Sequence, residues 1–286
     1  MKKIKTININ NIEVGSNLYT PIIAEIGVNH LGSLNRAKKM VDDAINGGAD
    51  FIKFQTYIAE KRYDLKTNPK GKLFTDNLKK WQLSKIQEKE LWGHAFKYTK
   101  NVFTSVYDVE SIKFSLDLGT CAFKIAAFEM RNQILLKEVI KTKLPIIISC
   151  GICNIKEIRD LVEYLDSKKA KYILLHTVSS YPLEKKYSMI VRIRELIDEF
   201  DCPIGHSDHT HGTEIPVLSV AAGASIIEKH FTDNKKYRES DNFFSINKEE
   251  LKELRFKLNQ AQDYVYSPNF IEDDPEKFMR NFIKIS

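Results

Sequence analysis

Two histidines in the last third of the chain have the most specific chemistry. His209 and His230 each close a short apolar run that is typical of a buried strand. Imidazoles on neighbouring strands can share one metal ion and leave positions open for water and substrate, as a catalytic metal requires. Mn²⁺, Fe²⁺, Co²⁺ and Zn²⁺ all suit such a site, and the alternative is a hydrogen-bonded pair without metal. Asp208 and Asp241 are candidates to orient these histidines or to accept substrate hydroxyls.

Two lysines and two glutamates also lie in, or just after, apolar runs of this kind. Lys53 and Lys124 sit in separate apolar runs, so different strands are expected to deliver them. Two such ammonium groups can neutralise a phosphate or a carboxylate, and the alternative is pairing with buried acids for stability alone. Glu25 lies in another such run, where a carboxylate is costly unless it is paired or catalytic. Glu129 follows Lys124 by five residues and is a second candidate for proton transfer.

Amide and hydroxyl side chains recur at similar depth in the same runs. Such groups suit phosphate oxygens and sugar hydroxyls. The candidates for binding substrate are Gln55, Ser105, Ser149, Ser179, Tyr181 and Ser207. The pair in 150-CGIC-153 has redox or metal-ligand spacing, but no second pair completes a zinc site. We interpret these cysteines as small residues at the end of a strand.

Eight apolar runs rich in Ile and Val alternate with segments of helical spacing. Runs of this kind indicate strands buried on both faces, as in a parallel sheet. The alternation predicts an α/β protein, a (β/α)₈ TIM barrel whose site lies at the carboxyl ends of the strands. We expect residues 1–20 to form a hairpin that closes the barrel, 21–265 the catalytic barrel and 266–286 a tail. The segment 58–82 is long for a loop and is a candidate lid or substrate loop.

Composition excludes several other classes of protein. The net charge of +6 is distributed over helices that mix Lys and Glu, without the basic stripe of a nucleic-acid binder. No apolar stretch approaches the ~20 residues of a membrane span. The N-terminus has no signal-peptide core. We expect a cytoplasmic protein that binds neither nucleic acid nor membrane.

Taken together, six motifs resemble the sialic acid synthase family, which includes N-acetylneuraminate, legionaminate and pseudaminate synthases. They occur in order between about residue 15 and residue 260. The motifs are 24-AEIGVNHLG-32, 50-DFIKFQTY-57, 123-FKIAAFEM-130, 178-VSSYP-182, 205-GHSDHT-210 and 228-EKHFT-232. Single motifs are not specific, but the set is.

The resemblance implies an aldol-type condensation of phosphoenolpyruvate with the open-chain aldehyde of an N-acyl hexosamine. The products are phosphate and a nonulosonic or related 3-deoxy-2-keto sugar acid for surface glycans. It also implies a role for each candidate. Glu25 and Glu129 transfer protons, and a divalent metal, Mn²⁺ before Mg²⁺ or Co²⁺, is held by His209 and His230. Phosphoenolpyruvate is bound by Lys53, Lys124, Ser105, Ser149 and Ser207. The acceptor sugar is bound by Gln55, Ser179, Tyr181 and Asp241.

The chain departs from the family in two motifs and in length. Ala127 and Phe128 stand where the family has Ser and Gly, and 239-ESD-241 replaces Gly-Pro-Asp. Ser286 falls about where the linker to the family's C-terminal antifreeze-like domain begins. We therefore expect either a homodimer of barrels or a separate protein that supplies the domain. The alternatives are a metal-dependent pyruvate aldolase or lyase, and a non-catalytic subunit that binds phosphoenolpyruvate or a sugar acid.

Overall fold

The computed structural model describes residues 5–63, 69, 71–265, 279 and 282. The chain begins with an antiparallel hairpin of β1 (Ile7–Ile9) and β2 (Ile12–Val14). Asn10 and Asn11 form its turn with positive φ, a conformation that asparagine tolerates better than most residues. Ile9 and Val14 pack on side chains from the barrel interior. The predicted hairpin is therefore present, and it covers one end of the barrel.

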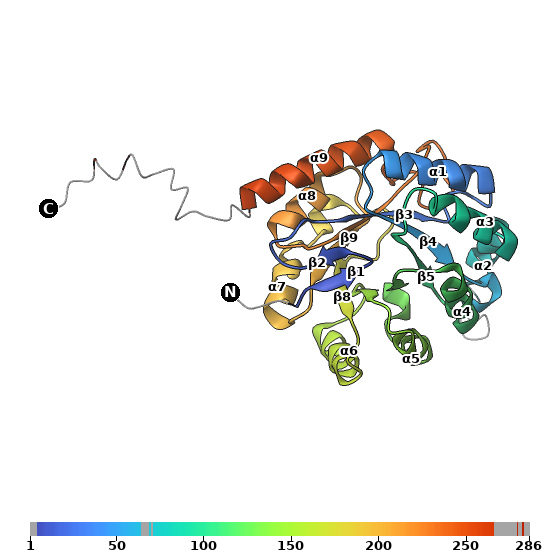
Figure 1. The fold of residues 1–286 in the computed structure, drawn as a ribbon, viewed down its shortest axis with the longest axis horizontal. Coiled ribbons are helices and arrows are strands. Elements are labelled where there is room, and N and C mark those ends of the chain that lie inside the picture. Colours follow the sequence, from blue (N-terminus) through green and yellow to red (C-terminus); the bar gives the residue numbers. More distant parts are fainter. Residues whose placement is uncertain (1–4, 64–68, 70, 266–278, 280–281, 283–286) are drawn as a thin grey trace.

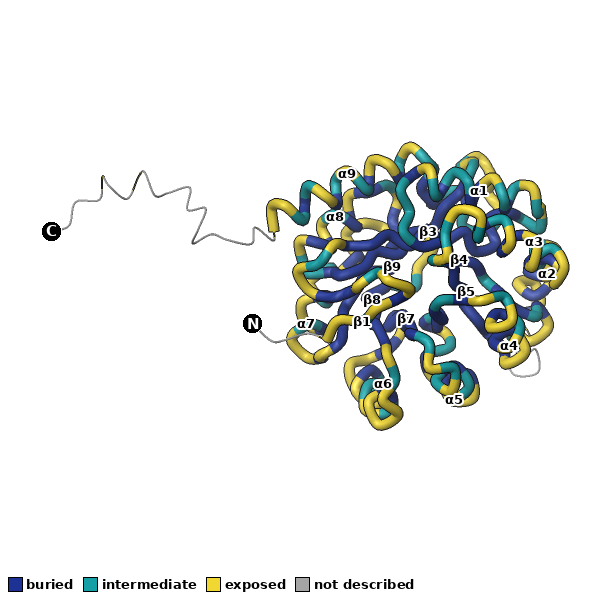
Figure 2. Tube along the Cα trace, viewed as in Figure 1, coloured by how far each residue is buried: buried dark blue, intermediate teal, exposed yellow. Residues whose placement is uncertain are grey.

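Eight parallel strands close into a barrel, as the apolar runs predict. The strand order is β10-β3-β4-β5-β6-β7-β8-β9. Figure 1 shows the helices arranged around the strands. The strands are β3 (Ile22–Gly27), β4 (Phe51–Thr56), β5 (Val102–Val106), β6 (Phe123–Ile125), β7 (Ile146–Ser149), β8 (Tyr172–Thr177), β9 (Ile204–Asp208) and β10 (Ile227–His230). Nearly all their residues are buried, because helices cover the outer face (Figure 2).

Helices surround the strands and bury one apolar face each. The helices are α1 (Leu34–Asn46), α3 (Lys85–Ala95), α4 (Val109–Leu118), α5 (Gln133–Lys141), α6 (Ile155–Ser167), α7 (Val191–Glu199), α8 (Glu214–Ala221) and α9 (Lys248–Val265). The Ser33 hydroxyl caps α1 by accepting from the Arg36 amide, as predicted for this position. Within the described residues, every helix is too short or too polar to pass through a bilayer.

The long connection after β4 contains helical segments. It contains the short 3₁₀ helix η1 (Ala59–Lys61) and helix α2 (Gly71–Trp81). Leu78 of α2 packs with Tyr57 and Tyr107 beside the carboxyl ends of β4 and β5. Expecting a loop over all of 58–82 was therefore wrong, because Thr75 and Leu78 give α2 a buried face. Residues 64–68 and 70, and the predicted tail except 279 and 282, lie outside the described residues.

Candidate active site

The two predicted lysines lie together in a buried network at the carboxyl ends of the strands. Lys53 Nζ is 2.7 Å from Glu228 Oε2 and 3.3 Å from Glu25 Oε2. Lys124 Nζ is 3.4 Å from the other oxygen of Glu228. All four side chains are at least 96% buried. We call Glu25, Lys53, Lys124 and Glu228 the lysine–glutamate network.

Burial and ion pairing have opposite effects on the pKa values of the groups in this network. Burial raises the pKa of Glu25 to about 7, although Lys53 opposes the shift. Burial lowers the pKa of Lys124 to about 8. For Glu228 burial is outweighed by the charges of Lys124 and Lys53, which hold its pKa well below the ordinary value. Glu228 is therefore the permanent anion, and Glu25 can gain or lose a proton near neutrality.

Several predicted substrate-binding side chains contact this network. The Lys124 ammonium donates to Ser149 Oγ over 2.7 Å, and the Ser207 hydroxyl donates to Glu228 over 2.8 Å. Gln55 donates to Glu25 over 2.7 Å. Ser105 is buried on β5, which pairs with both lysine-bearing strands. The carboxyl ends of β4, β5, β6, β7 and β9 thus converge on one polar centre.

The two predicted histidines lie together on the neighbouring side of the barrel mouth. The rings of His209 and His230 have centroids 5.5 Å apart. Tyr181 lies 4.1 Å from the His209 ring and Phe244 lies 5.4 Å from the His230 ring. We call Tyr181, His209, His230 and Phe244 the imidazole–aromatic cluster.

Both imidazoles are neutral and have nitrogen lone pairs available. Burial lowers the pKa of His209 to about 4 and that of His230 well below its ordinary value. His209 Nδ1 is 2.8 Å from the Val178 carbonyl and must donate to it, which leaves Nε2 unprotonated. His230 Nδ1 has no hydrogen-bond partner among the described residues. The pair fits a metal ion that takes two protein nitrogens, and no group of three or more His, Cys, Asp or Glu suited to a metal occurs in the described part of the chain.

Asp241 reaches the imidazole–aromatic cluster from the segment after β10. Its Oδ2 is 3.5 Å from His230 Nδ1. Burial raises its pKa to about 6, although 26% of the side chain is exposed. Its backbone amide donates to Asn29, which fixes this position against the loop after β3. Asp241 is therefore placed to meet both His230 and a ligand.

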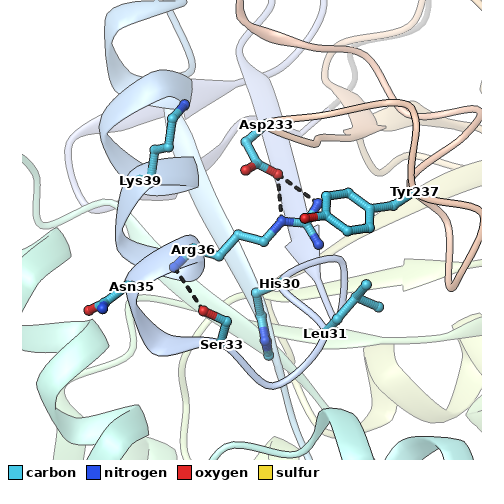
Figure 3. A pocket seen from close by; sticks show the side chains of 8 residues that line it. All are labelled: His30, Leu31, Ser33, Asn35, Arg36, Lys39, Asp233 and Tyr237. Carbon is cyan, nitrogen blue, oxygen red and sulfur yellow. Dashed lines mark hydrogen bonds and ion pairs between the residues drawn. The ribbon is translucent and has the colours of Figure 1, made fainter.

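Arg36 holds the same segment from outside the site. Its guanidinium binds Asp233 at 2.6 Å and donates to Asn242 at 2.7 Å. The ring of Tyr237 lies over it at 3.9 Å (Figure 3). Arg36, Asp233 and Tyr237 border a surface pocket. Because Arg36 is already paired with the Asp233 carboxylate, we interpret it as the anchor of the segment that carries Asp241.

Some predicted residues lie outside both groups. Glu129 is on the 3₁₀ helix η2 (Ala127–Glu129) and accepts from Asn132 at 2.8 Å, so its catalytic role stays a prediction. Asp208 pairs with Lys229 rather than with an imidazole. Ser179 lies in the connection after β8, close to Tyr181. Cys150 and Cys153 are free, and burial raises the pKa of both thiols, which disfavours redox chemistry.

Sequence reasoning missed two residues of the site. Glu228 joins both lysines, yet its motif was interpreted only for its histidine. Alternation along β10 could have revealed it, because Glu228 and His230 occupy the same face of the strand. Tyr107 follows β5 directly; its hydroxyl interacts with Ser105 and lies in electrostatic range of Glu25 and Lys53. The sequence carries no comparable signal for Tyr107.

A closed (β/α)₈ barrel with buried cations and neutral imidazoles at the carboxyl ends of its strands defines a TIM-barrel enzyme. A family model described as NeuB family matches residues 40–267. The chain belongs to the NeuB family, which confirms the resemblance to the sialic acid synthases. The prediction of a synthase-type transferase that forms carbon–carbon bonds is confirmed at this level.

Named relatives and solved structures agree with this family. The chain is 36% identical to the N,N'-diacetyllegionaminic acid synthase of Campylobacter jejuni, over 85% of this chain and 76% of the relative. It is 33% identical to the N-acetylneuraminate-9-phosphate synthase of Drosophila melanogaster, over 84% and 68%. The N-acetylneuraminic acid synthetase of Leptospira borgpetersenii, solved in complex with citrate, superposes with a TM-score of 0.90 at 32% identity, over 98% of this chain and 96% of that one.

Proposed function

We propose that the chain condenses phosphoenolpyruvate with the open-chain aldehyde of an N-acyl hexosamine-like sugar. The products are phosphate and a nonulosonic or related 3-deoxy-2-keto sugar acid. The observation that carries the proposal is the burial of Lys53 and Lys124 beside two neutral imidazoles at one barrel mouth. The named relatives, synthases of related sugar acids, support it.

Phosphoenolpyruvate suits the lysine–glutamate network. Its carboxylate and phosphate need several cationic and hydroxyl donors within a few ångströms. Lys53 and Lys124 supply the charge, and the hydroxyls of Ser105, Ser149 and Ser207 lie around them. The citrate in the Leptospira relative is another small polyanion, which is consistent with an anion site in this fold.

A divalent metal suits the imidazole–aromatic cluster. His209 and His230 would hold it, and we propose Mn²⁺ because two nitrogens with open positions suit a borderline ion. When bound, the ion supplies Lewis-acid polarisation of the aldehyde oxygen. Tyr181 and Asp241 border the same space and would orient the acceptor sugar. The aldehyde carbon would then face the phosphoenolpyruvate held by the lysines.

The reaction balances with protons that this site can move. Carbon 3 of phosphoenolpyruvate attacks the aldehyde carbon, and the aldehyde oxygen gains a proton. Water adds to the cationic carbon 2 and loses a proton. The adduct then expels phosphate by C–O cleavage, while the new hydroxyl becomes the keto oxygen and gives its proton to the departing phosphate. Glu25 can accept or donate these protons because its pKa of about 7 matches neutral pH. Glu129, on the 3₁₀ helix that follows β6, is the second candidate.

Phosphate release from phosphoenolpyruvate tests this proposal. We expect release with Mn²⁺ and one member of a panel of N-acyl hexosamines and simple aldoses, and none with chelator. Lys124→Met should lower the rate at least ~100-fold, since it removes a buried phosphate partner. Lys113→Met, on the exposed face of α4, is the matched control and should not change it. Binding of phosphoenolpyruvate without phosphate release across the panel would contradict the synthase and indicate a binding subunit.

A further inference from the structure

We propose that Arg62 is a third cation of the substrate site and binds an anionic oxygen group, a carboxylate or a phosphate, of a substrate. The inference rests on the proposed function and concerns the same barrel mouth. Arg62 directly follows η1, and its Cζ lies 3.2 Å from the centroid of the Tyr107 ring. It lies 5.9 Å from the centroid of Tyr57. Two aromatic rings therefore hold the guanidinium in place.

Tyr107 connects Arg62 to the lysine–glutamate network. Tyr107 is only 9% exposed, and its charge partners include Arg62, Glu25 and Lys53. One face of the ring carries the guanidinium, while the hydroxyl interacts with Ser105. Arg62 is thus separated from the predicted phosphoenolpyruvate site by a single side chain.

Among the residues that the structure describes, no carboxylate neutralises the charge of Arg62. Among the described residues no carboxylate lies within ion-pair distance of it, and its Nη1 is buried without a hydrogen-bond partner. Other cations of the chain differ: the adjacent Lys61 pairs with Glu110 at 2.5 Å, and Arg36 pairs with Asp233 at 2.6 Å. A partly buried guanidinium without an anion is costly. An anionic substrate group would supply the missing partner.

The positive charge of the lysine–glutamate network is also smaller than the negative charge of phosphoenolpyruvate. Near neutral pH phosphoenolpyruvate carries about three negative charges, one on the carboxylate and up to two on the phosphate. The network offers two lysines, which are opposed by Glu228 and by a Glu25 that is partly ionised. Arg62 is a nearby cation that forms no ion pair with any described residue. Its planar donors also match the oxygen pairs of carboxylates and phosphates.

Two substrates could carry the anionic group. One is phosphoenolpyruvate, and the other is a phosphate on the acceptor sugar. The name of the Drosophila relative, a 9-phosphate synthase, makes the second source concrete. Both use the same guanidinium chemistry, so the experiment has one arm for each.

The test uses three variants of the full chain. Arg62→Gln removes the charge, Arg62→Lys keeps it, and Lys61→Gln is the control at the adjacent paired residue. Phosphoenolpyruvate affinity is measured by calorimetry without acceptor. The kcat/KM is then measured for the accepted hexosamine with and without a terminal phosphate. Thermal melting of each variant checks that folding is unchanged.

We expect Arg62→Gln to lower one of these quantities at least tenfold, with partial rescue by Arg62→Lys and no change with Lys61→Gln. Weaker phosphoenolpyruvate binding assigns Arg62 to that substrate. A loss confined to the phosphorylated hexosamine assigns it to the acceptor. Wild-type values in both arms, or a wild type that binds no phosphoenolpyruvate, would overturn the proposal. If the wild type binds phosphoenolpyruvate without turnover, the proposed function fails while the binding arm still decides on Arg62.

Discussion

The lysine–glutamate network and the imidazole–aromatic cluster share one barrel mouth but treat charge differently. The network buries four ionisable groups, and its lysines and carboxylates contact one another at 2.7–3.4 Å. In the cluster, burial keeps both imidazoles neutral, and the rings of Tyr181 and Phe244 pack against them.

This difference indicates what each side can bind. Buried lysines need carboxylates when no ligand is present, and an incoming anion can take over part of that pairing. Neutral imidazoles need no counterion and present lone pairs to a cation. Each half of the barrel mouth can therefore be stable before a ligand arrives.

The largest effect should follow from removing the anion that both lysines share. Glu228→Gln keeps the shape of the side chain but leaves Lys53 and Lys124 with Glu25 alone. We expect the free energy of unfolding in urea to fall by about 3–5 kcal/mol. Glu214→Gln, at an exposed pair with Lys185, should change it by less than about 0.5 kcal/mol. Equal losses in the two variants would show that the network does not depend on Glu228.

A second effect should be confined to the imidazole–aromatic cluster. His209→Ala and His230→Ala should each weaken Mn²⁺ binding more than ~100-fold, a larger loss than follows from changing a residue that only supports a metal ligand. Mn²⁺ binding is measured by calorimetry or electron paramagnetic resonance. His211, like His209, lies in the connection after β9, but it is exposed. His211→Ala is therefore the control and should bind the metal normally. Unchanged metal content in either of the first two variants would disprove the site.

Glu88 is a third buried carboxyl group, and unlike Glu228 it is not paired with any described lysine. Glu88 is 9% exposed and receives a hydrogen bond from Thr56, and among the described residues no lysine forms an ion pair with it, although the charge of Lys85 acts on it from a distance. Burial raises its pKa to about 8, so from pH 4.5 to 8 the folded state keeps a proton that the unfolded state has lost. The free energy of unfolding should fall as pH rises through this window. Glu88→Gln has no such proton to lose, so its free energy of unfolding should not show this fall. The difference in free energy of unfolding between Glu88→Gln and the wild type should therefore shift by about 1–3 kcal/mol in favour of the variant between pH 5 and pH 8.5. Parallel pH profiles would contradict this account.

The fold could be predicted from the sequence because burial on two faces leaves a plain signal. Runs such as 145-PIIISC-150 contain too many branched apolar residues for a surface strand, and eight of them alternate with helical segments. The exception was α2, whose Gly, Lys and Asn residues obscure a short apolar face. Its burial comes from tertiary contacts of Leu78 with Tyr57 rather than from local pattern.

The site could be predicted only where a strand delivers the side chain. Lys53, Lys124, His209 and His230 come from strands or the residues just after them, so barrel geometry brings them together. Arg62 instead lies in the connection after β4, and only the fold brings its guanidinium over the ring of Tyr107. Pairing also needs three dimensions, since Glu228 and Lys53 are 175 residues apart in the chain.

Phosphoenolpyruvate affinity in the presence of chelator tests the central claim most directly, namely that the anion binds to the lysines independently of the metal site. Calorimetry would compare the wild type with Lys124→Met and His209→Ala. The account predicts that Lys124→Met weakens binding by roughly 2–5 kcal/mol, while His209→Ala stays within about twofold of wild type. Wild-type affinity in Lys124→Met, or an equal loss in His209→Ala, would contradict the division of the site into two halves.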